Sequence, residues 1–266
     1  MRAPGIQASP HPEEAASGHL EGRGVKVVFQ PPARQKKMTE EQAPATRLYG
    51  RRKGKKLSAH QQSLLDTLLP RLALDPTRPL GGAAALFPHA PADLWLEIGF
   101  GGGEHLAAEA EAHPSQGFIG CEFFENGVVK ALSLIAAKDL GNIRLYRGDA
   151  GAIIDALPAR SLAGIYLLYP DPWPKRRQHK RRFLSDEMLK RLARVLRPGG
   201  EIRFATDIDN NAGWTLARIL RAPDFEWRAQ QAQDWRGPWP GWASTRYEAK
   251  ALAAGRQSVY LTFVRR

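Results

Sequence analysis

One acidic residue stands between two prolines, and an aromatic residue and a dense run of positive charge follow shortly after it. Residues 169–175 are Tyr-Pro-Asp-Pro-Trp-Pro-Lys, and six of the eight residues from 175 to 182 are lysine or arginine. Because proline fixes φ and lacks a backbone donor, this segment cannot lie inside a helix or a central strand. The apolar residues 163–168 just before it are typical of a buried strand. The pattern predicts a stiff loop that presents Asp171 and Trp173 at a strand end, beside a surface suited to a polyanion.

Acidic residues, Asp171 among them, recur near the ends of the predicted strands. An acid stands at or just before the carboxyl end of nearly every predicted strand: Glu97, Glu122, Asp149, Asp171 and Asp207. In a parallel sheet, ligands bind beyond those ends. Five acids at such positions are hard to explain by solubility alone, so we expect them to form a ligand site.

The glycine-rich segment 99–103 (Gly-Phe-Gly-Gly-Gly) lets a ligand approach the backbone closely. A dinucleotide fingerprint requires another glycine where Glu104 stands, and a carboxylate there would face the pyrophosphate. S-adenosylmethionine has no phosphate and carries a cationic sulfonium and ammonium, which suit an acid such as Glu97. Glu122 at the next strand end can accept both ribose hydroxyls, and Asp149 can accept the adenine amino group.

The positive charge is concentrated in two short segments. The chain of 266 residues has a net charge of +12, from 39 basic and 27 acidic residues. Residues 47–56 and 175–182 each hold six basic residues and no acid, so the remainder is formally neutral. Two concentrated patches indicate phosphate binding, which should weaken steeply with salt.

The elements that must position these residues alternate between strands and helices. Predicted strands cover 93–98, 117–122, 142–146, 163–169 and 201–206, with helices at 104–113, 126–137, 183–196 and 211–221 and two short strands near 225–227 and 258–264. This alternation predicts a mostly parallel sheet with helices on both faces. Ser58 is expected to cap an earlier helix that bends at Pro70. Residues 1–45 are interpreted as a disordered or loosely attached extension, and residues 46–266 as one domain with an N-terminal basic arm.

Composition excludes several other classes of protein. Cys121 is the single cysteine, which excludes a disulfide framework and a cysteine zinc site, and we expect it to be a small buried hydrophobe. No apolar run approaches the roughly 20 residues of a membrane span, and the N-terminus has no secretory pattern. The default expectation is a cytoplasmic protein without a metal, as a monomer or a homodimer. The aromatic residues of the tail are expected mostly to pack in a small core.

Taken together, these motifs resemble the bacterial tRNA (guanine-N7-)-methyltransferase family. The resemblance covers residue 47 to the end and is carried by segments 96–101 (LEIGFG), 148–150 (GDA), 170–173 (PDPW), 180–182 (KRR), 205–207 (ATD) and 245–248 (TRYE), together with Glu122 and Lys175. It implies a class I methyltransferase fold, Rossmann-like and doubly wound, with seven strands of which the last is antiparallel. It also implies S-adenosylmethionine as cofactor and tRNA as partner.

The resemblance further implies a role for individual residues. Asp171 would be the acidic residue of the catalytic site, and the cofactor would be bound by Glu97, Gly99, Gly101, Glu122, Asp149 and Asp171. The substrate would be bound by Lys175, Asp207, Thr245, Arg246, Tyr247 and Glu248. The basic run is expected to contact RNA through Arg177, Gln178, His179, Lys180, Arg181 and Arg182.

The chemistry agrees with these assignments. Guanine N7 has an in-plane lone pair and no proton, so direct displacement at the methyl requires alignment rather than a general base. Asp171 can stabilise the charge that the purine gains, or orient guanine through its N1–H and amino group. Trp173 either stacks on a base or packs within the loop. Because N7 faces a deep, narrow groove in A-form RNA, the target guanine must be exposed or flipped.

Two alternatives stay open at this point. Methyltransferases that act on exocyclic amino groups use an Asn/Asp-Pro-Pro-aromatic loop, but Trp173 occupies the place of the second proline. The other alternative is a non-enzymatic RNA-binding module, against which the intact set of acids argues. Nucleoside mass analysis separates the first from N7 methylation, and methyl transfer itself separates the second.

Overall fold

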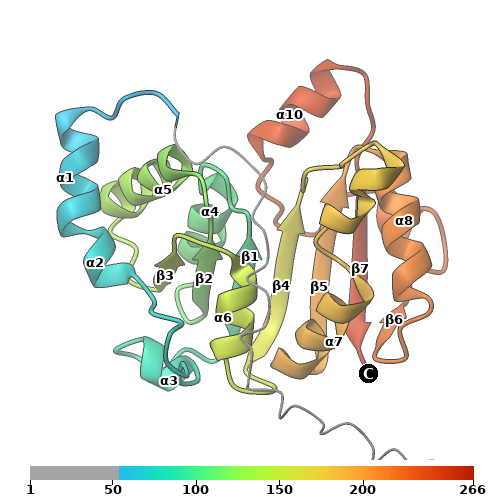
Figure 1. The fold of residues 1–266 in the computed structure, drawn as a ribbon, viewed down its shortest axis with the longest axis horizontal. Helices are drawn as coiled ribbons and strands as arrows, with labels where there is room; N and C mark the ends of the chain where they lie inside the picture. The colour runs from blue at the N-terminus through green and yellow to red at the C-terminus, as the bar shows by residue number, and fades with distance from the viewer. Residues whose placement is uncertain (1–53) are drawn as a thin grey trace, which may run out of the picture. The chain divides into compact units, whose positions relative to one another are not determined.

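The computed structural model describes residues 54–266. The predicted extension 1–45 and most of the basic arm lie outside the described residues. Seven strands form one sheet in the order β3-β2-β1-β4-β5-β7-β6 (Figure 1). Their bounds are β1 Leu94–Ile98, β2 Gly117–Cys121, β3 Ile143–Tyr146, β4 Leu162–Leu168, β5 Leu196–Thr206, β6 Phe225–Trp227 and β7 Val259–Arg265.

The sheet is parallel from β3 to β5 and antiparallel at its other edge. β1 pairs in parallel with β2 and β4, while β7 pairs antiparallel with both β5 and β6. The predicted doubly wound, seven-stranded sheet with an antiparallel last strand is confirmed. The strand predictions are correct to within a few residues, except that β5 begins at Leu196 rather than at 201.

Helices pack on both faces of the sheet. They are α1 Ala59–Thr67, α2 Leu69–Leu72, α3 Ala83–Leu86, α4 Glu104–Ala112, α5 Glu125–Lys138, α6 Ala150–Ala156, α7 Asp186–Val195, α8 Asp209–Ile219, α9 Gln233–Arg236 and α10 Arg246–Ala253, with a 3₁₀ helix, η1, at Arg176–Arg181. Apolar residues of α6, α7 and α8 join one hydrophobic core, and those of α1, α2, α4 and α5 join a second. Across the described residues, no helix combines the length and apolar character that a membrane crossing requires.

Side-chain caps decide where several helices begin. Ser58 and Gln61 form a reciprocal capping box at the start of α1, as the sequence predicts. The helix expected from residue 183 begins instead at Asp186, because the Ser185 side chain accepts a hydrogen bond from the Met188 N–H. α6 was not expected from the sequence; it is capped by Asp149, which accepts from the Gly151 N–H at 2.9 Å.

Close backbone packing holds the glycine-rich loop in place. Gly127, in the first turn of α5, faces this loop so closely that an added Cβ would lie 2.2 Å from the carbonyl oxygen of Gly101. Gly103 has φ +77° and would place a Cβ 2.6 Å from that of Ala131. The loop is therefore shaped by the helix packed against it as well as by its own glycines.

Two glycine substitutions in helices should consequently have opposite effects. Gly127→Ala should lower the free energy of unfolding, because the new methyl group collides with backbone atoms that have no room to move. Gly213→Ala in α8 is the matched control: its Cβ would meet nothing within 4 Å. That change should stabilise the protein by about 0.5–1 kcal/mol through helix propensity. Denaturant unfolding measures both, and an equal gain in the two variants would contradict the packing described.

Candidate active site

The predicted site residues meet at one edge of the sheet. Register pairs Ile98 with Cys121, Cys121 with Tyr146, and Ile98 with Leu167, so these strands end side by side. Glu97 is the next-to-last residue of β1, and the segments that follow β2, β3, β4 and β5 carry Glu122, Asp149, Asp171 and Asp207. The helix α10 lies beyond the same edge, past the arrowheads of β4 and β5 in Figure 1. The structure thus brings distant parts of the chain to the edge where parallel sheets bind ligands.

Glu122 fastens the glycine-rich loop to the end of β2. One carboxylate oxygen accepts from the Gly101 N–H at 2.8 Å, and the other accepts from the Phe123 and Phe124 N–H groups at 2.7 and 2.8 Å. Gly99 and Gly101 have φ of +71° and +60°, values that favour glycine. These charge-assisted hydrogen bonds keep a partly buried carboxylate beside the loop.

Asp149 has both a structural role and a free oxygen at the site. One carboxylate oxygen caps α6, and no hydrogen bond to the other is made within residues 54–266. The side chain is half-buried at the end of β3. It can therefore keep its cap and still accept a hydrogen bond from a ligand.

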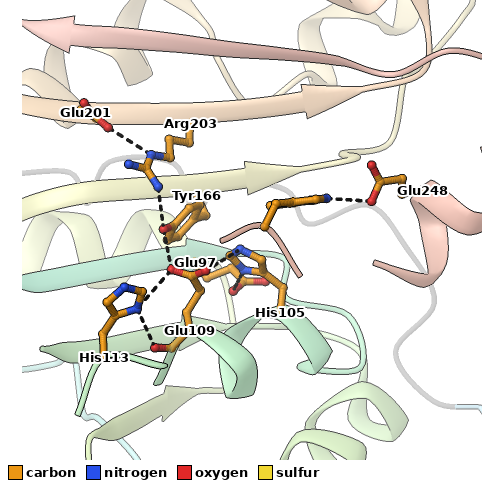
Figure 2. Close-up of polar contacts among 9 residues, drawn as sticks. Glu97, His105, Glu109, His113, Tyr166, Glu201, Arg203 and Glu248 are labelled. Carbon is orange, nitrogen blue, oxygen red and sulfur yellow. Dashed lines mark hydrogen bonds and ion pairs between the residues drawn. The ribbon is translucent and has the colours of Figure 1, made fainter. Parts of the chain in front are cut away.

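Glu97 is buried and paired with a histidine that the sequence did not single out. Only 4% of Glu97 is exposed, and the Nδ1–H of His105 donates to its Oε2 at 2.8 Å (Figure 2). Burial is the largest influence on the pKa of His105 and lowers it, but the negative charges of Glu97 and Glu109 outweigh it, so the pKa is raised. No motif points to an isolated histidine in a helix, and only the fold places it beside Glu97.

A chain of polar contacts extends from this pair across the sheet, as Figure 2 shows. The Tyr166 hydroxyl donates to Glu109 at 2.8 Å, and Arg203 donates to the Tyr166 oxygen at 3.2 Å and to Glu201 at 3.0 Å. Burial, followed by the charge of Glu109, raises the pKa of Tyr166, so its hydroxyl remains a donor. Buried polar groups that are hydrogen-bonded in this way specify one arrangement of the strands they join.

The loop that carries Asp171 is strained on both sides. Tyr169 and Trp173 have φ of +48° and +45°, although neither is glycine. Such conformations cost about 1–2 kcal/mol each and persist where the surroundings impose them. Tyr169 is held by its N–H, which donates to the Ala205 carbonyl at 2.8 Å, and by its hydroxyl, which donates to Ser258 at 2.9 Å. Asp171 is exposed and makes no hydrogen bond or ion pair within residues 54–266.

Arg182 supports this loop from the interior. Only 5% of Arg182 is exposed; its Nε–H donates to the Pro172 carbonyl at 2.8 Å and its Nη2 group to Asn210 Oδ1 at 2.6 Å. Its guanidinium carbon also lies 5.2 Å from the centre of the Trp214 ring. The sequence places Arg182 with the RNA-contacting residues, but its burial commits the guanidinium to the protein.

The rest of the basic run lies nearer the surface, mostly on η1. Lys175, Arg177 and Lys180 are exposed, whereas Gln178, His179 and Arg181 are half-buried. The guanidinium of Arg181 lies 4.9 Å from the centre of the Trp173 ring. The loop aromatic residue and the basic run thus form one continuous surface.

The predicted substrate segment 245–248 begins α10. Thr245 caps the helix by accepting from the Glu248 N–H at 3.1 Å. Glu248 is 5% exposed and accepts hydrogen bonds from Trp242 Nε1, at 2.7 Å, and from the Tyr260 hydroxyl. Tyr247 is 44% exposed, and its ring would lie 3.4 Å from a Cβ at Gly101, so it flanks the glycine-rich loop.

The remaining predicted residues have clear partners. Asp207 accepts a hydrogen bond from Arg256 Nε at 2.7 Å, and the guanidinium carbon of Arg246 lies 5.0 Å from the centre of the Tyr247 ring.

Two further expectations from the sequence are confirmed. Trp239 and Trp242 pack with Tyr260, which confirms that these aromatic residues of the tail form a small core. Cys121 is 1% exposed, as expected, and burial raises the pKa of its thiol. A thiol in that state is a poor nucleophile.

Sequence relatives of this chain point to one family. A family model described as "Putative methyltransferase" matches residues 91–261. A tRNA (guanine-N(7)-)-methyltransferase of Rhodopseudomonas palustris is 54% identical over 218 residues, which cover 82% of this chain and 85% of the relative. One from Bradyrhizobium diazoefficiens is 52% identical and covers 82% and 92%, respectively. Among solved structures, the 16S rRNA methyltransferase KamB aligns with 66% of this chain and 89% of its own, at 18% identity and a TM-score of 0.48.

The position of Arg182 predicts a stability effect that an exposed arginine would not show. Arg182→Lys should lower the free energy of unfolding by about 1–3 kcal/mol, because an ammonium cannot reach both Pro172 and Asn210 with the geometry of a guanidinium. Arg177→Lys, on the exposed part of the same run, should change it by less than about 0.5 kcal/mol. Denaturant unfolding compares the two, and indistinguishable effects would refute the supporting role of Arg182.

Proposed function

Because the chain belongs to the tRNA (guanine-N(7)-)-methyltransferase family, we propose that it transfers a methyl group from S-adenosylmethionine to N7 of a guanine in tRNA. One observation of the structure carries this proposal. Asp171 stands exposed on a strained loop, at the same sheet edge as the glycine-rich loop and directly before the basic run. An acidic residue that can bind guanine, a loop that can bind the cofactor and a basic run that can bind phosphates therefore lie close together.

A cytoplasmic location and the oligomeric state stay predictions.

The residues at the glycine-rich loop fit S-adenosylmethionine. A Cβ at Gly99 would meet nothing within 4 Å, so the backbone there is open to a ligand. Glu122 and Asp149 present carboxylate oxygens at neighbouring strand ends, where hydroxyl and amino groups can donate to them. Together with Glu97 and Asp171 they make the edge acidic, which suits a cationic cofactor. When bound, S-adenosylmethionine supplies the methyl group in electrophilic form.

The role we assign to Asp171 is to bind the guanine that accepts the methyl group. Guanine N7 needs no deprotonation, so the work of the protein is to align the base and to balance its new positive charge. An exposed carboxylate that has no partner within residues 54–266 is available for either task. The strain at Tyr169 and Trp173, together with Arg182 behind Pro172, fixes the direction in which Asp171 is presented.

The tRNA is bound on two sides of this loop. Lys175, Arg177 and Lys180 provide exposed charge for the phosphates, with Gln178, His179 and Arg181 beside them. On the other side, α10 carries Arg246 and Tyr247 next to the glycine-rich loop, while Thr245 and Glu248 serve the substrate by holding that helix. Asp207 completes this side through its contact with Arg256.

Removal of the Asp171 carboxylate should separate methyl transfer from RNA binding. Asp171→Ala should slow single-turnover transfer to unmodified tRNA by about a hundredfold or more, because the base loses its orienting charge. The dissociation constant for tRNA should change by less than about threefold, since phosphate contacts dominate affinity. Asp66→Ala, a change to an exposed acid on α1, is the control. Unchanged turnover in Asp171→Ala would remove the role assigned to this residue.

The salt dependence of tRNA binding should identify the phosphate contacts. Arg177→Ala and Lys180→Ala should each reduce the slope of log affinity against log salt by about one, as expected for the loss of one phosphate contact. Lys138→Ala is the control, because Lys138 ends α5 on the way to the start of β3, away from the site edge. Filter binding over a salt series gives the slopes. If the control changes the slope as much as the other two, the basic run is not the RNA surface.

A further inference from the structure

In the part of the chain that the structure describes, one side chain hydrogen-bonds to the Glu97 carboxylate. Glu97 is 4% exposed, and His105 is the one partner of its side chain within the described residues. An ionised carboxylate that is buried without a partner is strongly destabilised. The conformation in which Glu97 approaches the cofactor loop is therefore set by His105.

His105 itself is placed where a positive charge needs compensation. It is 2% exposed and lies in the first turn of α4, where the helix dipole disfavours a cation. Two carboxylates offset this: Glu97 bonds to Nδ1, and Glu109 Oε1 lies 3.8 Å from Nε2 (Figure 2). Nε2 has no hydrogen-bond partner among the described residues.

The ring of His105 also contacts the residues that hold α10. Its centre lies 4.9 Å from that of Trp242, with the planes tilted by 44°. Trp242 in turn donates from Nε1 to Glu248 Oε2 at 2.7 Å. A continuous series of contacts therefore runs from Glu97 through His105 and Trp242 to Glu248.

We propose that His105 is a positioning residue with two separable duties: its Nδ1–H orients Glu97 for the cofactor, and its ring seats Trp242 so that Glu248 holds α10 for the tRNA. The inference rests on the proposed function, because it takes Glu97 as a cofactor residue and α10 as part of the tRNA site. The two duties use different atoms of one side chain. Substitutions that keep one and remove the other can therefore separate them.

Two variants of His105 provide that separation. His105→Asn keeps an amide N–H at the place of Nδ1 but has no ring to contact Trp242. His105→Phe keeps a ring but leaves Glu97 without a donor. Binding of S-adenosylhomocysteine is measured by calorimetry and binding of unmodified tRNA by filter retention, so that no turnover is needed.

The two variants should fail in opposite ways. His105→Phe should weaken S-adenosylhomocysteine binding about tenfold or more and change tRNA affinity by less than about twofold. His105→Asn should keep cofactor affinity within about threefold and weaken tRNA binding about fivefold. The same loss of both ligands in both variants, or no loss in either, would overturn the proposal.

A third variant keeps the test decisive if His105→Phe does not fold. Trp242→Phe keeps one aromatic ring but removes the Nε1–H that donates to Glu248 and the second ring of the indole, so it should reproduce the tRNA defect of His105→Asn with normal cofactor binding. A cofactor defect of equal size in Trp242→Phe would overturn the proposal. Wild-type protein that binds both ligands but makes no 7-methylguanosine would refute the proposed function alone, since the binding constants test His105 independently.

Discussion

The parallel register of β1 with β2 and β4 is the constraint on which the site depends. Because these strands are aligned, their carboxyl ends fall at one edge, and loops from distant parts of the chain meet there. Gly127 adds a second condition by packing its bare backbone against the Gly101 carbonyl. Strand pairing and helix packing, and not local sequence alone, thus set the positions of the glycine-rich loop, Glu122 and Asp149.

Two buried basic side chains hold the residues of the site against the sheet. Arg182 donates to the Pro172 carbonyl in the loop of Asp171, and His105 donates to the buried Glu97 carboxylate. Both are nearly inaccessible themselves. The residues assigned to chemistry are therefore held by neighbours that no ligand is expected to touch, which is how a site keeps a strained loop in one conformation.

Much of the fold could be predicted from the sequence because its signals are local. Short apolar runs, separated by helical patterns, predicted all seven strands, and Ser58 predicted the start of α1. α6 was missed because its cap, Asp149, had been interpreted only as a ligand residue. The burial of Arg182 and the partnership of His105 with Glu97 could not be predicted, since each arises from contacts between residues eight or more positions apart that only the packed chain defines.

The reaction proposed for this site is methylation of guanine at N7 in tRNA. The most direct measurement is to incubate the full chain with S-adenosylmethionine and unmodified tRNA, digest the product to nucleosides and identify the methylated nucleoside by mass spectrometry. We expect 7-methylguanosine as the product. Methylated adenosine or cytidine, or tRNA without any added methyl group, would contradict it.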